Sequence, residues 1–283
     1  MELFDNHAHY NDEKFNEDRD EIIREIYNSG VTKFICAGYS LESSIKALEI
    51  ANKYDFIYTI SGVSPNDIPG KNQDEDLEGK TEEEKEKLFT ESMQIVDKQL
   101  EKIEKLAQNE KVVAKGEIGL DYYWNKQNKE LQKQVFIKQI KIANKLNLPI
   151  VIHTREAVMD TLDILKNIQP TIKPGVFHCC PLNIELVKEA LKLGFYISFA
   201  GPITFKNSKN AREIAQMVPL NKMLIETDSP YLAPEPVRGT RNDSRNVKYI
   251  AEKIAEYRGV TVEEIAKATY ENAIKVFGLL EKF

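Results

Sequence analysis

Cysteine is scarce in this chain of 283 residues, which contains only Cys36, Cys179 and Cys180. Three cysteines at this spacing exclude the disulfide framework of a small secreted protein and fit a reducing compartment. No apolar run approaches the roughly 20 residues that span a bilayer, and the acidic beginning lacks the apolar segment of a signal peptide. We therefore expect a soluble, cytoplasmic protein that makes no contact with a membrane.

Excess positive charge is also missing, because the formal net charge is −6 at pH 7. A protein that coats nucleic acid non-specifically relies on a broad basic surface. The net negative charge therefore excludes proteins that coat nucleic acid, although a local basic binding site stays possible. Nothing in the sequence indicates an obligate protein partner, so we expect a monomer.

Short β-rich runs alternate with longer amphipathic runs from one end of the chain to the other, which is typical of β/α units. Strands are predicted at residues 3–9, 31–38, 56–63, 112–119, 149–154, 175–180, 195–201 and 223–228. Apolar residues three and four positions apart mark the helices. Helices are predicted at residues 16–28, 41–54, 92–107, 131–146, 157–168, 184–191, 211–217, 245–257 and 262–277.

Eight such units in a chain of this length predict an α/β fold, a (β/α)₈ TIM barrel that forms one domain over residues 1–283. The alternative is an open doubly wound sheet, but "CAGYSL" after the second strand is not its GxGxxG fingerprint. One segment, at about residues 66–91, is biased in composition. It is predicted to be a solvated, partly helical acidic insertion after the third strand.

All four histidines fall at the predicted C-terminal ends of strands. His7 and His9 end the first strand, His153 ends the fifth and His178 ends the sixth. A barrel of this kind carries its chemistry at that end of its strands. Alternate residues of a strand point to one face, so His7 and His9 can both aim into the barrel mouth.

Two acidic residues share this placement: Glu117 lies near the end of the fourth strand, and Asp228 ends the eighth. A carboxylate in an apolar strand is costly unless it is paired, hydrogen-bonded or bound to metal. A strand histidine taken alone is more often structural than a ligand, and a buried carboxylate often belongs to a structural ion pair. The joint placement of four histidines and two carboxylates nevertheless predicts a metal site. Imidazole and carboxylate ligands suit Zn, Mn, Fe, Co or Ni, and a carboxylate-rich site can hold Mg. Cys179 and Cys180 form no CxxC pair and are interpreted as small apolar residues.

Several motifs follow one another over nearly the whole chain: "DNHAHY", "GEIGLDYYW", "HTREA", "YISFAGPITFKN", "ETDSPYLAP", "RGTRN" and "ENAIKVFG". In this order, the chain closely resembles the TatD family of metal-dependent deoxyribonucleases, within the amidohydrolase-like hydrolases. The resemblance implies a TIM barrel with up to two divalent metal ions, Mg or Mn in use, and Zn, Ni, Co or Fe as alternatives. It implies that His7, His9 and Asp228 bind one metal, that His153 and His178 bind the other, and that Glu117 bridges them.

The activity implied by the resemblance is hydrolysis of DNA phosphodiester bonds by metal-activated water, as a 3′ to 5′ exonuclease on single strands or 3′ ends. The catalytic candidates are Asp228, Glu117 and Glu226. Asp228 would orient the water or accept its proton. Glu226, two residues earlier on the same side of the strand, is expected to support a ligand through a hydrogen bond.

Two stretches depart from the family pattern. "GVSPND" has Ser64 and Asn66 where the family often has the histidines of Gly-Val-His-Pro-His, and "CCPLN" after His178 replaces the usual Phe-Ser-Gly. The proposed ligands are intact, so these departures bear on phosphate contacts and substrate choice.

Loops after the fifth, seventh and eighth strands carry basic residues that are candidates for binding phosphate. The substrate-binding candidates are Arg155, Lys206, Arg238 and Arg241, and Lys209, Arg212 and Arg245 lie in the same loops. The alternative to phosphate binding, for each of these residues, is an ordinary solvated charge on the surface. Trp124 and Tyr122 or Tyr123 are candidates for stacking bases, with packing inside the fold as the alternative.

Two other functions stay open. One is an amidohydrolase or deacylase acting on an acyl or amide substrate, including aminoacylated RNA. In some relatives a carboxylated strand-four lysine bridges the metals, and Lys115 lies two residues before Glu117. The other is a non-catalytic metal-holding scaffold, which requires that metal-loaded protein turn over none of these substrates.

Overall fold

Eight parallel strands pair in sequence order, each with the next along the chain. The computed structural model describes residues 1–68, 77, 79–124, 126 and 128–279. Its strands are β1 Leu3–Ala8, β2 Val31–Ala37, β3 Ile57–Ser61, β4 Val112–Asp121, β5 Ile150–Arg155, β6 Val176–Phe177, β7 Tyr196–Phe199 and β8 Met223–Ile225. Most strand residues are buried, as expected for parallel strands that are covered on both faces.

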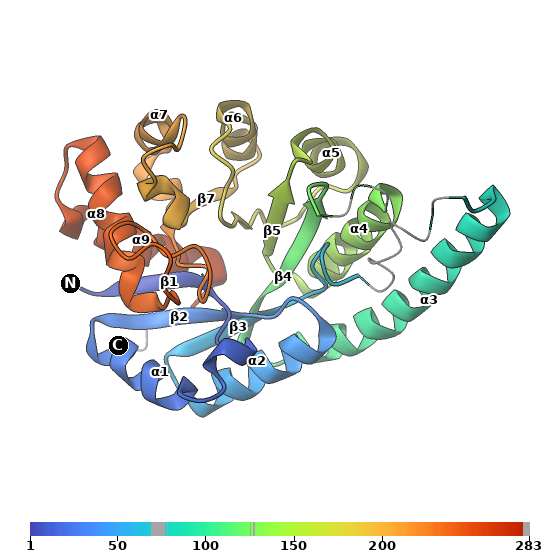
Figure 1. Ribbon diagram of the computed structural model, residues 1–283, viewed down its shortest axis with the longest axis horizontal. Coiled ribbons are helices and arrows are strands. Elements are labelled where there is room, and N and C mark those ends of the chain that lie inside the picture. The colour runs from blue at the N-terminus through green and yellow to red at the C-terminus, as the bar shows by residue number, and fades with distance from the viewer. Residues whose placement is uncertain (69–76, 78, 125, 127, 280–283) are drawn as a thin grey trace.

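Helices follow the strands around the outside of the sheet (Figure 1). They are α1 Arg19–Asn28, α2 Leu41–Lys53, α3 Glu82–Leu106, α4 Lys129–Leu146, α5 Val158–Asp163, α6 Ile184–Lys192, α7 Ala211–Met217, α8 Val247–Arg258 and α9 Val262–Phe277. The prediction of a (β/α)₈ TIM barrel is confirmed. None of the described helices combines the length and the apolarity that crossing a bilayer requires.

The barrel closes between β1 and the segment that follows β8. The His9 N–H donates to the Ser229 carbonyl at 2.6 Å, and the Asp228 N–H donates to the His7 carbonyl at 2.9 Å. Below them the buried Asp5 carboxylate accepts hydrogen bonds from the Thr227 N–H at 2.9 Å and the Ser244 hydroxyl at 2.5 Å. These bonds join the two ends of the sheet and place two candidate metal ligands, His7 and Asp228, side by side.

Apolar side chains fill the end of the barrel opposite the histidines. Phe4 of β1, Val113 of β4 and Leu224 of β8 belong to one buried cluster, which Phe277 of α9 also joins. A second cluster lies between the strands and the surrounding helices. The polar site therefore rests on a packed apolar base.

The helix after the acidic insertion begins earlier than its apolar pattern predicts. α3 begins at Glu82, whereas the pattern places its beginning at residue 92. Thr81 and Glu84 form a capping box, in which each side chain accepts a hydrogen bond from the other residue's backbone N–H. The T-x-x-E spacing was a usable signal for this helix start. Figure 1 shows the N-terminal half of α3 extending away from the barrel; residues 69–76 and 78 of the insertion lie outside the described part of the chain.

Another predicted helix, at residues 157–168, is divided. α5 ends at Asp163, and a π-helical turn, η3 Ile164–Ile168, completes the segment. Apolar spacing alone does not distinguish an α-helical turn from a π-helical one.

Candidate metal centre

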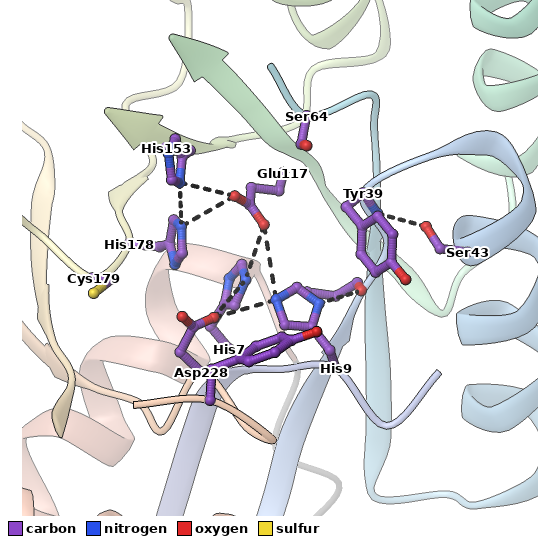
Figure 2. A network of polar contacts seen from close by, with 12 residues as sticks. His7, His9, Tyr39, Ser43, Ser64, Glu117, His153, His178, Cys179 and Asp228 are labelled. Carbon is purple, nitrogen blue, oxygen red and sulfur yellow. Dashed lines mark hydrogen bonds and ion pairs between the residues drawn. The ribbon is translucent and has the colours of Figure 1, made fainter. Parts of the chain in front are cut away.

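The Glu117 carboxylate lies between two pairs of histidines at the mouth of the barrel (Figure 2). Its Oε2 lies 3.5 Å from His7 Nε2 and 3.9 Å from His9 Nε2. Its Oε1 lies 3.0 Å from His153 Nδ1 and 3.3 Å from His178 Nε2. One oxygen thus faces each pair, which is the arrangement that a carboxylate shared by two cations requires.

Asp228 completes the group formed by His7 and His9, called the β1 half below. Its Oδ1 lies 3.2 Å from His9 Nε2 and 3.9 Å from His7 Nε2. The backbone supports this half, because His9 Nδ1 lies 3.1 Å from the Ala37 carbonyl oxygen. Asp228 adopts a left-handed backbone with φ of 56°, a sparsely populated conformation for a residue with a side chain.

His153 and His178 form the second group, called the β5 half, in which His153 Nδ1 lies 3.3 Å from His178 Nε2. A carboxylate stands behind each imidazole. Asp121 Oδ2 lies 2.9 Å from His153 Nε2, and Glu226 Oε1 lies 3.2 Å from His178 Nδ1. Carboxylates in this position fix the ring orientation of a ligating histidine and raise its basicity.

An irregularity in β1 places the first pair of histidines. The register of β1 with β2 shifts between Asp5 and Ala8. Consecutive side chains consequently both reach the barrel interior: Asn6 donates to the Ser198 hydroxyl at 2.8 Å, and His7 faces Glu117. Strict alternation predicts that His7 and His9 share a face, but it does not predict this shift.

Electrostatics in the site favour ionised carboxylates. Burial opposes the charge on Glu117, but the positive charge of His178 and hydrogen bonds from His153 and His178 hold its pKa well below the usual range. Burial also opposes the charge on His153, but Asp121 and Glu117 raise the pKa of that imidazole to about 9. The carboxylates thus require nearby positive charge, which a divalent cation can provide in place of protons on the histidines.

The donor set fits metal ions. Two groups of possible ligand atoms each lie within 4.8 Å of one another: His7 with Glu117 and His178, and His7 with His9 and Asp228. Within the described part of the chain, both ring nitrogens of the fully buried His7 lack a hydrogen-bond partner. A buried polar atom without a partner is costly, and a cation at Nε2 would satisfy one of the two.

These residues open into a pocket of about 1010 Å³, which is at the upper end of the roughly 300–1,000 Å³ usual for small-molecule sites. His9, Glu117, His153 and Asp228 are part of its lining. Apolar side chains such as Leu182 also line it. The pocket has room for a ligand larger than a single small anion.

The predicted phosphate-binding cations divide into two groups. Arg155 lines the pocket, as does Lys209. Lys206 and Arg238 are exposed and do not line it. Arg241 is held elsewhere, because its guanidinium pairs with the Asp18 carboxylate and donates to the Lys14 carbonyl at 2.8 Å.

The two departures from the family pattern also lie at this pocket. The Ser64 hydroxyl donates to Asp67 Oδ2 at 2.6 Å, and the Asn66 amide donates to Asp121 Oδ2 at 3.1 Å. Burial and the neighbouring Asp228 raise the pKa of the Cys179 thiol well above its usual value. Neither cysteine belongs to a candidate ligand group in the described chain.

Asp121 was not identified from the sequence, and Lys115 was identified there only as an alternative bridging residue. Asp121 lies four residues after Glu117 on the same strand, so the two-residue period of a strand already placed both on one face. Lys115 is fully buried below Glu117, and its ammonium donates to the Ser61 carbonyl at 3.0 Å. The contact of Lys115 is thus with backbone, whereas Glu117 contacts the histidines.

Comparison with known proteins decides the family. The sequence profile of the family described as "TatD related DNase" matches residues 4–278. The chain belongs to the TatD family. This confirms the resemblance seen in the motifs.

Known relatives match almost the whole length of this TatD-family chain. It is 40% identical over 275 residues to the uncharacterised metal-dependent hydrolase YabD of Bacillus subtilis, covering 97% of this chain and 98% of the relative. It is 28% identical over 282 residues to the 3′-5′ ssDNA/RNA exonuclease TatD of Shigella flexneri, covering 98% and 99%. The crystal structure of YJJV, a TatD homologue from Escherichia coli, matches with a TM-score of 0.82 at 25% identity and covers 98% of both chains. Membership places the chain among metal-dependent hydrolases.

Proposed function

We propose that the chain hydrolyses phosphodiester bonds of single-stranded DNA from its 3′ end, with two divalent metal ions per chain. The observation that carries the proposal is the position of Glu117, whose two oxygens each face a separate pair of histidines. Support for DNA comes from the family and from the name of the Shigella flexneri relative.

The β1 half would hold one cation and the β5 half the other, with Glu117 as the shared ligand. Imidazole and carboxylate donors accept Mg or Mn as well as Zn, Ni, Co or Fe, and we expect Mg or Mn in use. When bound, a pair of cations lowers the pKa of water and offsets the negative charge that develops on phosphorus.

Asp228 is our candidate for orienting the water and accepting its proton. It lines the pocket, its side chain is 14% exposed, and one of its oxygens contacts His9. The carboxylate can therefore orient a water in the pocket or accept its proton. The left-handed backbone of Asp228 is an outlier of the kind that gathers at functional sites.

Glu226 and Asp121 would act through the histidines. Glu226 is fully buried and accepts hydrogen bonds from the Ser198 hydroxyl and from the Cys179 N–H, each at 2.5 Å. With both of its oxygens occupied and no access to the pocket, Glu226 is a positioning residue for His178 rather than an acid or base. Asp121 has the same relation to His153.

The charge of the loaded pocket suits an anionic substrate. Two divalent cations bring four positive charges, and Glu117, Asp228, Asp121 and Glu226 return four negative ones. At the pocket lining Arg155 and Lys209 outnumber the further carboxylate of Asp67, which leaves a positive excess of one charge. Phosphodiesters carry one negative charge per linkage, and cations near a cleft raise their local concentration.

The decisive experiment incubates metal-reconstituted protein with 5′-labelled single-stranded DNA in Mg, Mn, Co or Zn. Stepwise shortening from the 3′ end is expected, and Asp228→Asn should abolish it. Asp163→Asn, which changes an exposed carboxylate on α5, is the matched control and should retain full activity. Parallel reactions with RNA, aminoacylated RNA and acyl or amide substrates test the alternatives. Turnover of an acyl substrate with intact DNA in all four metals would assign the site to a deacylase.

A further inference from the structure

The three consecutive aromatic residues after β4 have different surroundings. Tyr122 is buried, and its hydroxyl donates to Asp160 Oδ2 at 2.7 Å. Tyr123 and Trp124 are 43% and 66% exposed, and Trp124 lines the pocket. Packing in the fold therefore explains Tyr122 but leaves most of the Trp124 indole in contact with solvent at the pocket.

Arg155 lies beside these rings with its charge available. Its guanidinium carbon lies 3.8 Å from the centroid of the Tyr123 ring and 5.4 Å from that of Trp124. The two rings meet edge to face, with centroids 4.8 Å apart. Within the described residues Arg155 has no carboxylate partner, whereas Arg241 pairs with one carboxylate and Arg245 with two. Flat aromatic and cationic groups thus stand together at the pocket, and we call Tyr123, Trp124 and Arg155 the platform.

Asp121 ties the platform to the candidate metal centre. Its Oδ1 accepts the backbone N–H groups of Tyr123 and Trp124, each at 3.0 Å. Its Oδ2 contacts His153 Nε2 at 2.9 Å. One buried carboxylate therefore fixes the aromatic loop relative to a candidate ligand. A platform held in place before binding loses little conformational entropy when a ligand stacks on it.

We propose that the platform stacks an unpaired nucleobase of the strand being hydrolysed, next to the scissile phosphate. This inference rests on the proposed phosphodiester hydrolysis. Indole and guanidinium groups stack on any base, because every base has a π-face. A base inside a duplex has both faces covered by its neighbours, so the subsite selects single strands or frayed ends without reading sequence.

The chain offers a direct readout, because Trp124 is its only tryptophan. Tryptophan fluorescence of the Asp228→Asn chain in Mg is titrated with a thymidine tetranucleotide and with an abasic oligonucleotide of the same length and charge. Stacking predicts a change in fluorescence with the tetranucleotide and none with the abasic strand. Free tryptophan in the same solutions corrects for absorption by the DNA.

Kinetics with the full-length chain give the second readout. Trp124→Ala should raise the KM for thymidine oligonucleotides roughly 5- to 150-fold, the range for losing one stacked base, and leave the KM for the abasic strand unchanged. Trp124→Phe keeps a ring and should retain most of the affinity. Tyr27→Ala, which removes an exposed aromatic on α1 outside the pocket lining, is the matched control and should change neither. Arg155→Gln should weaken both strands, because a guanidinium also contacts phosphate.

The two readouts separate this inference from the proposed function. A wild-type chain that shortens DNA, with equal fluorescence changes for both strands or unchanged KM in Trp124→Ala, overturns the base subsite and leaves the hydrolase. A base-dependent fluorescence change in Asp228→Asn, together with a wild-type chain that shortens no DNA, supports the subsite and overturns the hydrolysis proposal.

Discussion

The β1 half and the β5 half of the site contain the same kind of candidate ligand, histidine, but hold it differently. In the β5 half a carboxylate stands behind each imidazole, Asp121 behind His153 and Glu226 behind His178. In the β1 half His9 contacts a backbone carbonyl, and neither nitrogen of His7 has a hydrogen-bond partner among the residues that the structure describes. The difference teaches that one donor set can be positioned by side chains on one side and by barrel closure on the other.

The residue common to both halves should show the largest effect. Glu117→Gln removes a charge that both histidine pairs face, so we expect weaker binding of both cations. Activity should fall by more than about 100-fold, because changing a residue that only supports a metal ligand already costs about 10- to 100-fold. Elemental analysis and DNA turnover measure the two effects. Two tightly held cations per chain in this variant would contradict the sharing of Glu117.

Single-ligand changes should separate the halves. His153→Ala removes a ligand from the β5 half and His9→Ala removes one from the β1 half, so each variant should hold one cation instead of two. We expect activity to fall by roughly 100-fold in each, because the proposed reaction uses both cations. Titration calorimetry with Mn counts the remaining sites. Loss of both cations in either variant would show that the halves depend on each other.

Changes to Asp121 and Glu226, the carboxylates behind the histidines of the β5 half, should show how far that half depends on side-chain support. Asp121→Asn and Glu226→Gln should lower metal affinity in the β5 half, or activity, by roughly 10- to 100-fold while the β1 half keeps its cation. The matched control is Asp5→Asn, because Asp5 is equally buried and contacts hydroxyl and backbone groups without touching an imidazole ring. Asp5→Asn should lower the temperature of unfolding and leave cation binding in the β5 half intact. The same loss in all three variants would reduce the carboxylates to structural groups.

The smallest effect is expected at Lys115, which lies below both halves. Burial lowers the pKa of its ammonium to about 7. Lys115→Met loses one hydrogen bond to Ser61 but also removes a buried charge, so the free energy of unfolding should change by less than about 1 kcal/mol. Both cations should remain, as elemental analysis can show. Loss of a cation here, with two retained in Glu117→Gln, would make Lys115 the bridging residue.

Much of the fold could be predicted because its signals are local. The alternation of β-rich and amphipathic runs gave all eight strands, and the placement of the four histidines at strand ends pointed to one end of the barrel. The beginning of α3 was placed ten residues late, since the apolar face of this helix begins after its capping box at Thr81. The π-helical end of the α5 segment left no sequence signal.

The sequence by itself determined which residues are candidates for metal, since strand order and the two-residue period bring His7, His9, Glu117, His153, His178 and Asp228 to one end of a parallel barrel. Only the tertiary structure decided how these residues are arranged around one another. Closure between β1 and β8 sets His7 beside Asp228, the register shift in β1 turns His7 inward, and Asp121 links His153 to Trp124. Tertiary structure likewise separated Arg155 at the pocket from Arg241 on Asp18, because the partner of a loop cation depends on contacts that are distant in sequence.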